Sequence, residues 1–226
     1  MAVLYIIGTP IGNLGDMSFR GVEILKTVAL VACEDTRRTL KLLNHFGIRA
    51  ALVSCRAQNE KYAAEKVIKV LNEGSNAAYV SDAGTPALSD PGAALVRLTV
   101  RAGHEAIPIP GSSAFASLVS VSGGMDKSVV FEGFLSPKTG RRRSRLKELL
   151  AWEGAFVLYE SPFRILKLLE DLAELESERY VCVGREMTKV HEEYIRGKAK
   201  DIFLFFKEKK EQIGEFSVYV SGRNAD

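Results

Sequence analysis

Short apolar segments alternate with helical patterns through the first half of the chain, and this alternation restricts the fold more than any other feature. We expect strands at residues 3–7, 28–33, 51–54, 77–81 and 105–108, and helices at 18–26, 36–45, 60–72 and 91–102. Asp90 and Pro91 would cap and start the last of these helices. Most of the strands are apolar without interruption, which is typical of strands covered on both faces. The alternation therefore predicts a mostly parallel sheet between two helical layers.

A stretch rich in small residues at 111–126 interrupts this alternation. We place a domain boundary there, between an N-terminal α/β domain at 1–122 and a C-terminal α/β domain at 123–226. In the second domain we expect a mixed sheet with strands at 129–134, 155–159, 180–185 and 217–220 and helices at 141–152, 162–175 and 199–210. The predicted fold class is therefore α/β, with two α/β domains.

The overall charge, the cysteines and the lengths of the apolar segments give no indication of a strongly basic, metal-binding, secreted or membrane-spanning protein. The 226 residues carry a net charge of only +3, so any case for nucleic-acid binding has to rest on local clusters. The three cysteines lie far apart without metal-ligand spacing, which fits a reducing compartment. No segment reads as a signal peptide or reaches the ~20 apolar residues of a membrane span. We expect a cytoplasmic protein with no metal and no membrane partner.

Three loops made of small residues follow expected strands, at 8–15, 81–92 and 110–114. In a parallel sheet all three would emerge at one edge and line one ligand-binding cleft. They contain no lysine or arginine and match no glycine pattern for dinucleotides or triphosphates. Asp82 suits a ligand with a cationic or hydroxylated part, although a structural turn or cap would also use an aspartate there.

Charged residues outside these loops allow two interpretations each. Asp35 either caps the helix at 36–45 or lies with Glu34 at the cleft mouth, where Arg37 or Arg38 would meet a polyanion. A basic cluster predicts either a surface that contacts phosphates or a solvated helix start. Its members are Lys138, Arg141, Arg142, Arg143, Arg145 and Lys147. No Ser/His/Asp triad and no histidine pair with metal spacing occurs.

Six segments taken together resemble one family, the bacterial 16S ribosomal RNA (cytidine-2'-O)-methyltransferases of the tetrapyrrole methylase superfamily. The segments are LYIIGTPIGNL (4–14), CEDTR (33–37), SDAGTPALSDPG (81–92), FEGFL (131–135), YES (159–161) and REMTK (185–189). The resemblance implies S-adenosylmethionine as methyl donor, bound in a cleft between the two domains. It further implies a cytidine 2'-hydroxyl of 16S rRNA in the small ribosomal subunit as acceptor, and a homodimer. Longer members continue past the position of Gly222.

The resemblance also implies site residues. Donor-binding residues would be Pro10, Asp82, Ala83, Gly84, Thr85, Ser113, Ala114, Tyr159 and Met187. We expect RNA phosphates at Arg37, Lys138, Arg141, Arg142 and Arg143. Candidates for a general base are Glu34, Asp35 and Glu160. Two other functions stay open: methylation of a tetrapyrrole precursor, and a non-enzymatic RNA-binding assembly factor.

Overall fold

A computed structural model describes residues 2–209 and 211–223 of the chain. It divides the chain into two compact units, Met1–Ser113 and Ala114–Asp226. We had expected the boundary near residue 122. The helix α5 (Ala114–Ser122) accounts for the difference, because it packs against strands of the second unit and so belongs to that unit.

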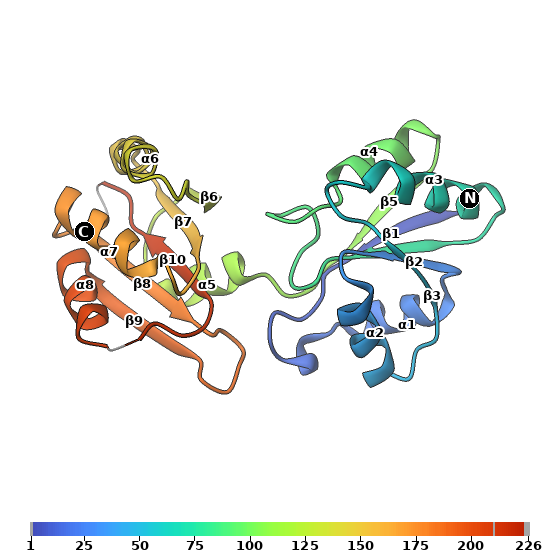
Figure 1. Ribbon diagram of the computed structural model, residues 1–226, viewed down its shortest axis with the longest axis horizontal. Helices are drawn as coiled ribbons and strands as arrows, with labels where there is room; N and C mark the ends of the chain where they lie inside the picture. The colour runs from blue at the N-terminus through green and yellow to red at the C-terminus, as the bar shows by residue number, and fades with distance from the viewer. Residues whose placement is uncertain (1, 210, 224–226) are drawn as a thin grey trace. The chain divides into compact units, whose positions relative to one another are not determined.

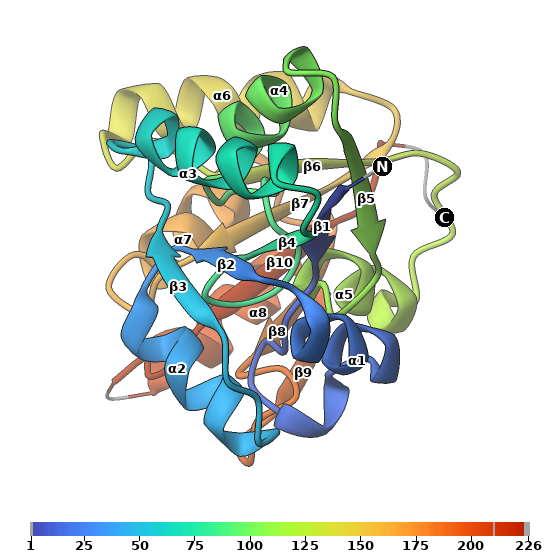
Figure 2. The same ribbon diagram turned by 90° about the vertical axis from the view of Figure 1, so that its right-hand side faces the viewer.

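The first unit is a five-stranded, fully parallel sheet with helices on both faces, as the alternating pattern predicted (Figures 1 and 2). Its strand order is β3-β2-β4-β1-β5. The strands are β1 (Val3–Ile7), β2 (Leu30–Cys33), β3 (Ala51–Ser54), β4 (Ala77–Val80) and β5 (Glu105–Ile109). The helices are α1 (Phe19–Thr27), α2 (Thr36–His45), α3 (Glu60–Asn72) and α4 (Ala93–Arg101), with a short 3-10 turn, η1 (Leu14–Asp16).

The central strand β4 shows why the sheet is covered on both faces. Ala77 and Tyr79 belong to an apolar core under α3 and α4, whereas Ala78 and Val80 belong to a second core with residues of α1 and α2. All four side chains are buried. Because successive side chains of a strand point to opposite faces, an unbroken apolar strand requires such a sandwich.

The start of α4 differs from the expectation. Its N-cap is Gly92, at φ 125°, and not Asp90. The carboxylate of Glu60 in α3 accepts hydrogen bonds from the first free amides of α4, at Ala94 (2.9 Å) and Leu95 (3.2 Å). A Cβ at position 92 would lie 2.4 Å from the ring of Tyr79, so only glycine fits this turn. The carboxylate of Glu60, which is distant in sequence, thus caps α4 in place of the expected Asp90.

The second unit has a mixed sheet of order β6-β7-β10-β8-β9, in which only the β6–β7 pair is parallel. The strands are β6 (Val129–Phe134), β7 (Ala155–Glu160), β8 (Tyr180–Arg185), β9 (Glu193–Lys198) and β10 (Phe216–Val220). Helices α6 (Thr139–Ala151), α7 (Ile165–Leu175) and α8 (Ala199–Glu208) cover one face and α5 the other (Figure 1).

The sequence did not predict β9. This edge strand has the polar sequence EYIRGK and no fully buried residue, so it lacks an apolar signal. The helix expected at 199–210 ends at Glu208, and residue 210 lies outside the described residues. No helix in the described part of the chain is long and apolar enough to cross a membrane.

Candidate active site

The three small-residue loops of the first unit meet at the carboxyl ends of β1, β4 and β5, as predicted. Thr9 and Gly84 exchange backbone hydrogen bonds of 2.9 and 3.0 Å, which joins the first loop to the second. The hydroxyl of Thr85 donates to the carbonyl of Ser112 at 3.3 Å, which joins the second loop to the third. This is the edge at which open parallel sheets bind ligands.

The glycines of these loops allow backbone to pack on backbone. A Cβ on Gly111 would lie only 2.5 Å from the carbonyl oxygen of Gly8, and one on Gly8 would lie 2.9 Å from Gly111. Gly84 has a φ of 79°, a conformation that favours glycine. Part of the small-residue pattern therefore reflects contact among the loops themselves, which makes the ligand-facing edge rigid.

Asp82 connects the second loop to the start of α2. Its Oδ1 accepts a hydrogen bond from the amide of Asp35 at 2.9 Å, and its Oδ2 lies 3.5 Å from a guanidinium nitrogen of Arg38. About a fifth of the side chain is exposed. The turn and ligand interpretations of Asp82 are therefore compatible, because a carboxylate held in place by one amide still faces solvent.

Asp35 is the N-cap of α2, which was one of the two interpretations. Its Oδ1 accepts from the amide of Arg37 at 2.8 Å, and its Oδ2 accepts from the Arg37 guanidinium at 3.0 Å. These hydrogen bonds hold the pKa of Asp35 well below its usual range. A carboxylate with such a low pKa is a poor proton acceptor at neutral pH.

Asp90 is a titratable group that the sequence indicated only as a helix cap. Burial, together with the negative charges of Glu34 and Asp82 and against a hydrogen bond with Ser81, raises the pKa of Asp90 to about 6. Glu34 itself is half-buried at the end of β2. The tertiary structure thus gathers three carboxylates at one sheet edge, from positions far apart in the sequence.

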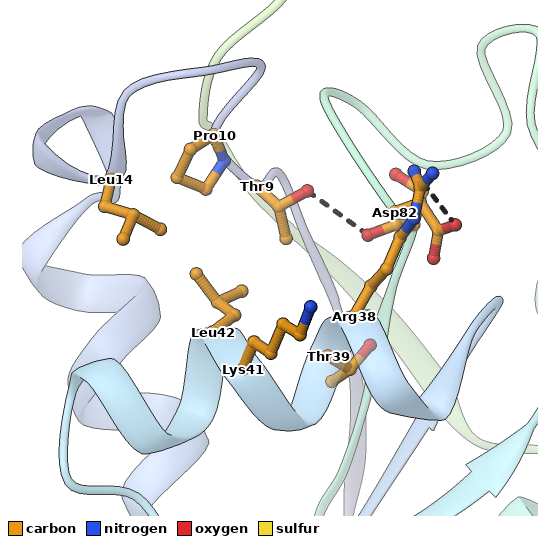
Figure 3. A pocket seen from close by; sticks show the side chains of 9 residues that line it. Thr9, Pro10, Leu14, Arg38, Thr39, Lys41, Leu42 and Asp82 are labelled. Atoms are coloured by element: carbon orange, nitrogen blue, oxygen red, sulfur yellow. Dashed lines mark hydrogen bonds and ion pairs between the residues drawn. The ribbon is translucent and has the colours of Figure 1, made fainter.

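A pocket of about 250 Å³ lies between the first loop, α2 and the start of the second loop (Figure 3). Its lining combines apolar, hydroxyl and charged side chains: Thr9, Pro10, Leu14, Arg38, Thr39, Lys41, Leu42, Ser81 and Asp82. Pro10 and Asp82 were predicted donor-site residues. Lys41 was not predicted, although it stands three positions after Arg38 and so shares a helix face with it.

Tyr159, at the end of β7, anchors the start of α5. Its hydroxyl accepts a hydrogen bond from the amide of Phe115 at 2.8 Å. Its ring packs against Phe131 and Phe134, with centroid separations of 4.8 and 5.8 Å. Tyr159 therefore positions Ala114, another predicted site residue, since Ala114 begins the same helix.

Met187 lies in a constrained turn after β8. It is buried, and a Cβ on Gly184 would come within 2.7 Å of its sulfur. The residues on either side, Glu186 and Thr188, have positive φ values of 50° and 67°. Lys189 closes the turn through ion pairs with the carboxylates of Glu186 and Glu215. Non-glycine residues held in this backbone region concentrate at functional sites.

Glu160, a predicted general base, has a structural environment instead. Its side chain is 2% exposed, and its Oε1 lies 2.7 Å from the Arg164 guanidinium. The same oxygen accepts from the amide of Ser161 at 2.7 Å. A carboxylate that is this buried and held by a guanidinium and a backbone amide is not accessible to a substrate hydroxyl, so we do not retain Glu160 as a base.

The basic cluster at the start of α6 also needs correction. Arg142 is buried, and its Nε donates to Asp171 of α7 at 2.6 Å. Arg143 pairs with Asp171 and Glu174 at 2.7 and 2.6 Å. The anions that compensate these cations therefore come from α7. Lys138 and Arg141 remain exposed.

Two α/β units, the first with small-residue loops that meet at the carboxyl edge of its parallel sheet, are the arrangement that the resemblance to the tetrapyrrole methylase superfamily implied. The model of the Tetrapyrrole (Corrin/Porphyrin) Methylases matches residues 3–202, and the chain belongs to this family. The superfamily that the sequence resemblance indicated is thereby confirmed.

Three relatives carry the same name, and two of them are of nearly the same length as this chain. A Borrelia garinii subsp. bavariensis protein named Ribosomal RNA small subunit methyltransferase I is 46% identical, over 97% of this chain and 98% of its own. The Thermotoga maritima protein of the same name is 44% identical, over 99% of this chain and 100% of its own. The Bacillus subtilis one is 39% identical, over 99% of this chain and 76% of its own.

Solved structures support the fold. A uroporphyrin-III-C-methyltransferase from Thermus thermophilus superposes with a TM-score of 0.68 at 16% identity, over 98% of this chain and 94% of its own. A cobalt precorrin-4 methyltransferase gives a TM-score of 0.69 at 16% identity, over 97% and 94%. At this identity the likeness concerns the fold alone. In the described residues no cluster of histidine, cysteine or acidic side chains could hold a metal ion.

Proposed function

We propose that this chain transfers a methyl group from S-adenosylmethionine to the ribose 2'-hydroxyl of a cytidine in 16S rRNA of the small ribosomal subunit. The observation that carries the proposal is the 44–46% identity to two small-subunit rRNA methyltransferases over essentially their whole length. We place the reaction in the cytoplasm, where its substrate is assembled, and we expect the enzyme to act as a homodimer.

The residues of each unit fit the chemistry of this donor. Asp82 offers a partly exposed carboxylate to a cationic or hydroxylated group, and Pro10 offers an apolar wall. In the second unit the Thr188 hydroxyl is buried without a hydrogen-bond partner among the described residues, beside Met187. A bound donor would supply that partner. The complete proposed donor site is Pro10, Asp82, Ala83, Gly84, Thr85, Ser113, Ala114, Tyr159 and Met187.

Positioning should account for most of the catalysis. The donor supplies an activated methyl group on its sulfonium, so the chain mainly aligns the hydroxyl for in-line displacement. Alignment of this kind contributes about 7–11 kcal/mol to lowering a barrier, whereas a general base contributes about 10²–10⁴-fold. Of the base candidates, Asp35 is a poor proton acceptor because hydrogen bonds from Arg37 lower its pKa, and Glu34 is the candidate that we retain.

The exposed cations are the proposed RNA contacts. Lys138 and Arg141 lie on the solvent side of the α6 start. Arg37 is 85% exposed and would contact phosphate while it remains paired with Asp35. Each cation that neutralises a phosphate adds to a salt-dependent affinity.

The test is transfer of labelled methyl groups to purified small subunits that lack the modification, followed by nucleoside mass spectrometry. We expect 2'-O-methylcytidine from the native chain, none from Asp82→Ala, and normal yield from Asp201→Ala, which removes an exposed carboxylate on α8. Calorimetry with S-adenosylmethionine should show that Asp82→Ala has lost donor affinity. Near-native donor binding by Asp82→Ala would remove Asp82 from the site.

Methylation of a tetrapyrrole precursor, the kind of activity for which the structural neighbours are named, is the alternative function. Those neighbours share only 16% of their residues with this chain, against 39–46% for the rRNA methyltransferases. Absorbance spectra recorded with a tetrapyrrole precursor and donor would reveal this activity. A methylated macrocycle without methylated rRNA would replace our proposal.

A further inference from the structure

Arg38 and Lys41 form a cationic pair on the face of α2 that borders the pocket. Both side chains line the pocket, and Figure 3 shows them extending from α2 toward the first loop and Asp82. Residues three apart on a helix are neighbours on its surface, about 5–6 Å apart at Cβ. Two like charges at this spacing destabilise a helix slightly unless an anion lies between them.

Arg38 has a nearby acidic partner, whereas Lys41 has none among the described residues. The guanidinium of Arg38 lies 3.5 Å from the Asp82 carboxylate, which is a loose contact, and the Arg38 side chain is 69% exposed. Lys41 is exposed and has no acidic partner among the described residues. By contrast, the charge of the neighbouring Arg37 is matched by Asp35.

We infer that Arg38 and Lys41 bind a backbone phosphate of the RNA next to the ribose that is methylated. A phosphate suits this pair, because a guanidinium binds its oxygens as a planar fork and an ammonium binds as a point charge. Both cations are accessible from solvent, as a polymeric substrate requires. This inference rests on the proposed function.

The position of the pair relative to Asp82 gives the contact a role in the reaction. In RNA the 3'-phosphate is attached to the ribose carbon that adjoins the one bearing the 2'-hydroxyl. A phosphate held at the pocket would therefore fix the hydroxyl close to Asp82, the proposed donor residue. Because Arg38 also touches Asp82, Lys41 is the cleaner position to test.

The experiment compares Lys41→Ala with Lys66→Ala. Lys66 is an exposed lysine of α3 whose ammonium lies over the ring of Tyr62, away from the pocket. Binding to small subunits is measured over a range of KCl concentrations, methyl transfer gives kcat and KM, and calorimetry gives donor affinity. Lys41→Arg serves as the conservative variant.

For Lys41→Ala we expect the slope of log affinity against log salt to fall by about 0.7–0.9, the value for one lost phosphate contact. The KM for subunits should rise about tenfold, as for loss of one charged hydrogen bond, with donor affinity unchanged. Lys41→Arg should restore most of the KM.

A slope and KM for Lys41→Ala equal to those of Lys66→Ala would overturn the inference. If the native chain binds subunits but transfers no methyl group, the proposed function fails, and the salt slopes still decide whether Lys41 contacts phosphate. If the native chain binds no subunit RNA, both proposals fail.

Discussion

Asp171→Ala should strongly destabilise the second unit, because Asp171 neutralises a buried arginine. Both members of the pair are 6% exposed as side chains, and the Nε–Oδ2 distance is 2.6 Å. Removing one partner of a buried ion pair costs about 3–5 kcal/mol, since the other charge stays buried without a counter-ion. Glu174→Ala is the matched control. Glu174 pairs with Arg143 at the same 2.6 Å but is 56% exposed, so its loss should cost at most about 1 kcal/mol.

Urea unfolding followed by circular dichroism measures both variants. The free energy of unfolding of a domain this size falls by about 2 kcal/mol per molar urea. Asp171→Ala should therefore lower the unfolding midpoint by about 2 M, and Glu174→Ala by less than about 0.5 M. The double variant Arg142→Met/Asp171→Leu should recover much of the loss, because an apolar pair replaces the buried charges. A midpoint for Asp171→Ala close to that of Glu174→Ala would refute the assignment of Arg142 to the core and return it to the RNA-binding candidates.

Three further substitutions test the loops and the carboxylate cluster. The pKa of Asp90 is about 6 in the folded chain and near 3.9 for an ordinary aspartate. The protonated carboxyl therefore stabilises the folded state fully below about pH 4, and this stabilisation is lost as the pH rises through 6. Asp90→Asn should therefore melt higher than the native chain at pH 7 and equally at pH 4 in calorimetric scans; a constant difference would contradict this. Gly111→Ala should cost about 1–3 kcal/mol in urea, because its Cβ would lie 2.5 Å from a backbone oxygen of Gly8. An unchanged midpoint would show that the loops can separate freely. Tyr159→Phe removes the acceptor for the Phe115 amide and should cost about 1 kcal/mol, with faster amide exchange at Phe115. Unchanged exchange there would exclude the anchoring role.

The strands and helices of the first unit could be predicted from the sequence because the hydrophobic patterns that indicate them are local. Runs such as residues 77–80 are apolar throughout, and the periods of strand and helix differ enough to separate them. The parallel order then places the loops after β1, β4 and β5 at one edge. The polar edge strand β9 lacked such a signal and was missed.

Side-chain partners depended on contacts that local patterns do not contain. Whether Arg142 meets solvent or Asp171 depends on a residue 29 positions away, on another helix. The cap of α4 comes from Glu60 of α3, and the raised pKa of Asp90 needs Glu34 and Asp82 beside it. The sequence by itself determined the fold class, the family and the loops that carry the site, since these follow from periodicity and ordered motifs. Only the tertiary structure decided which charged groups are neutralised and which remain available, because burial and electrostatics act through space across distant parts of the chain.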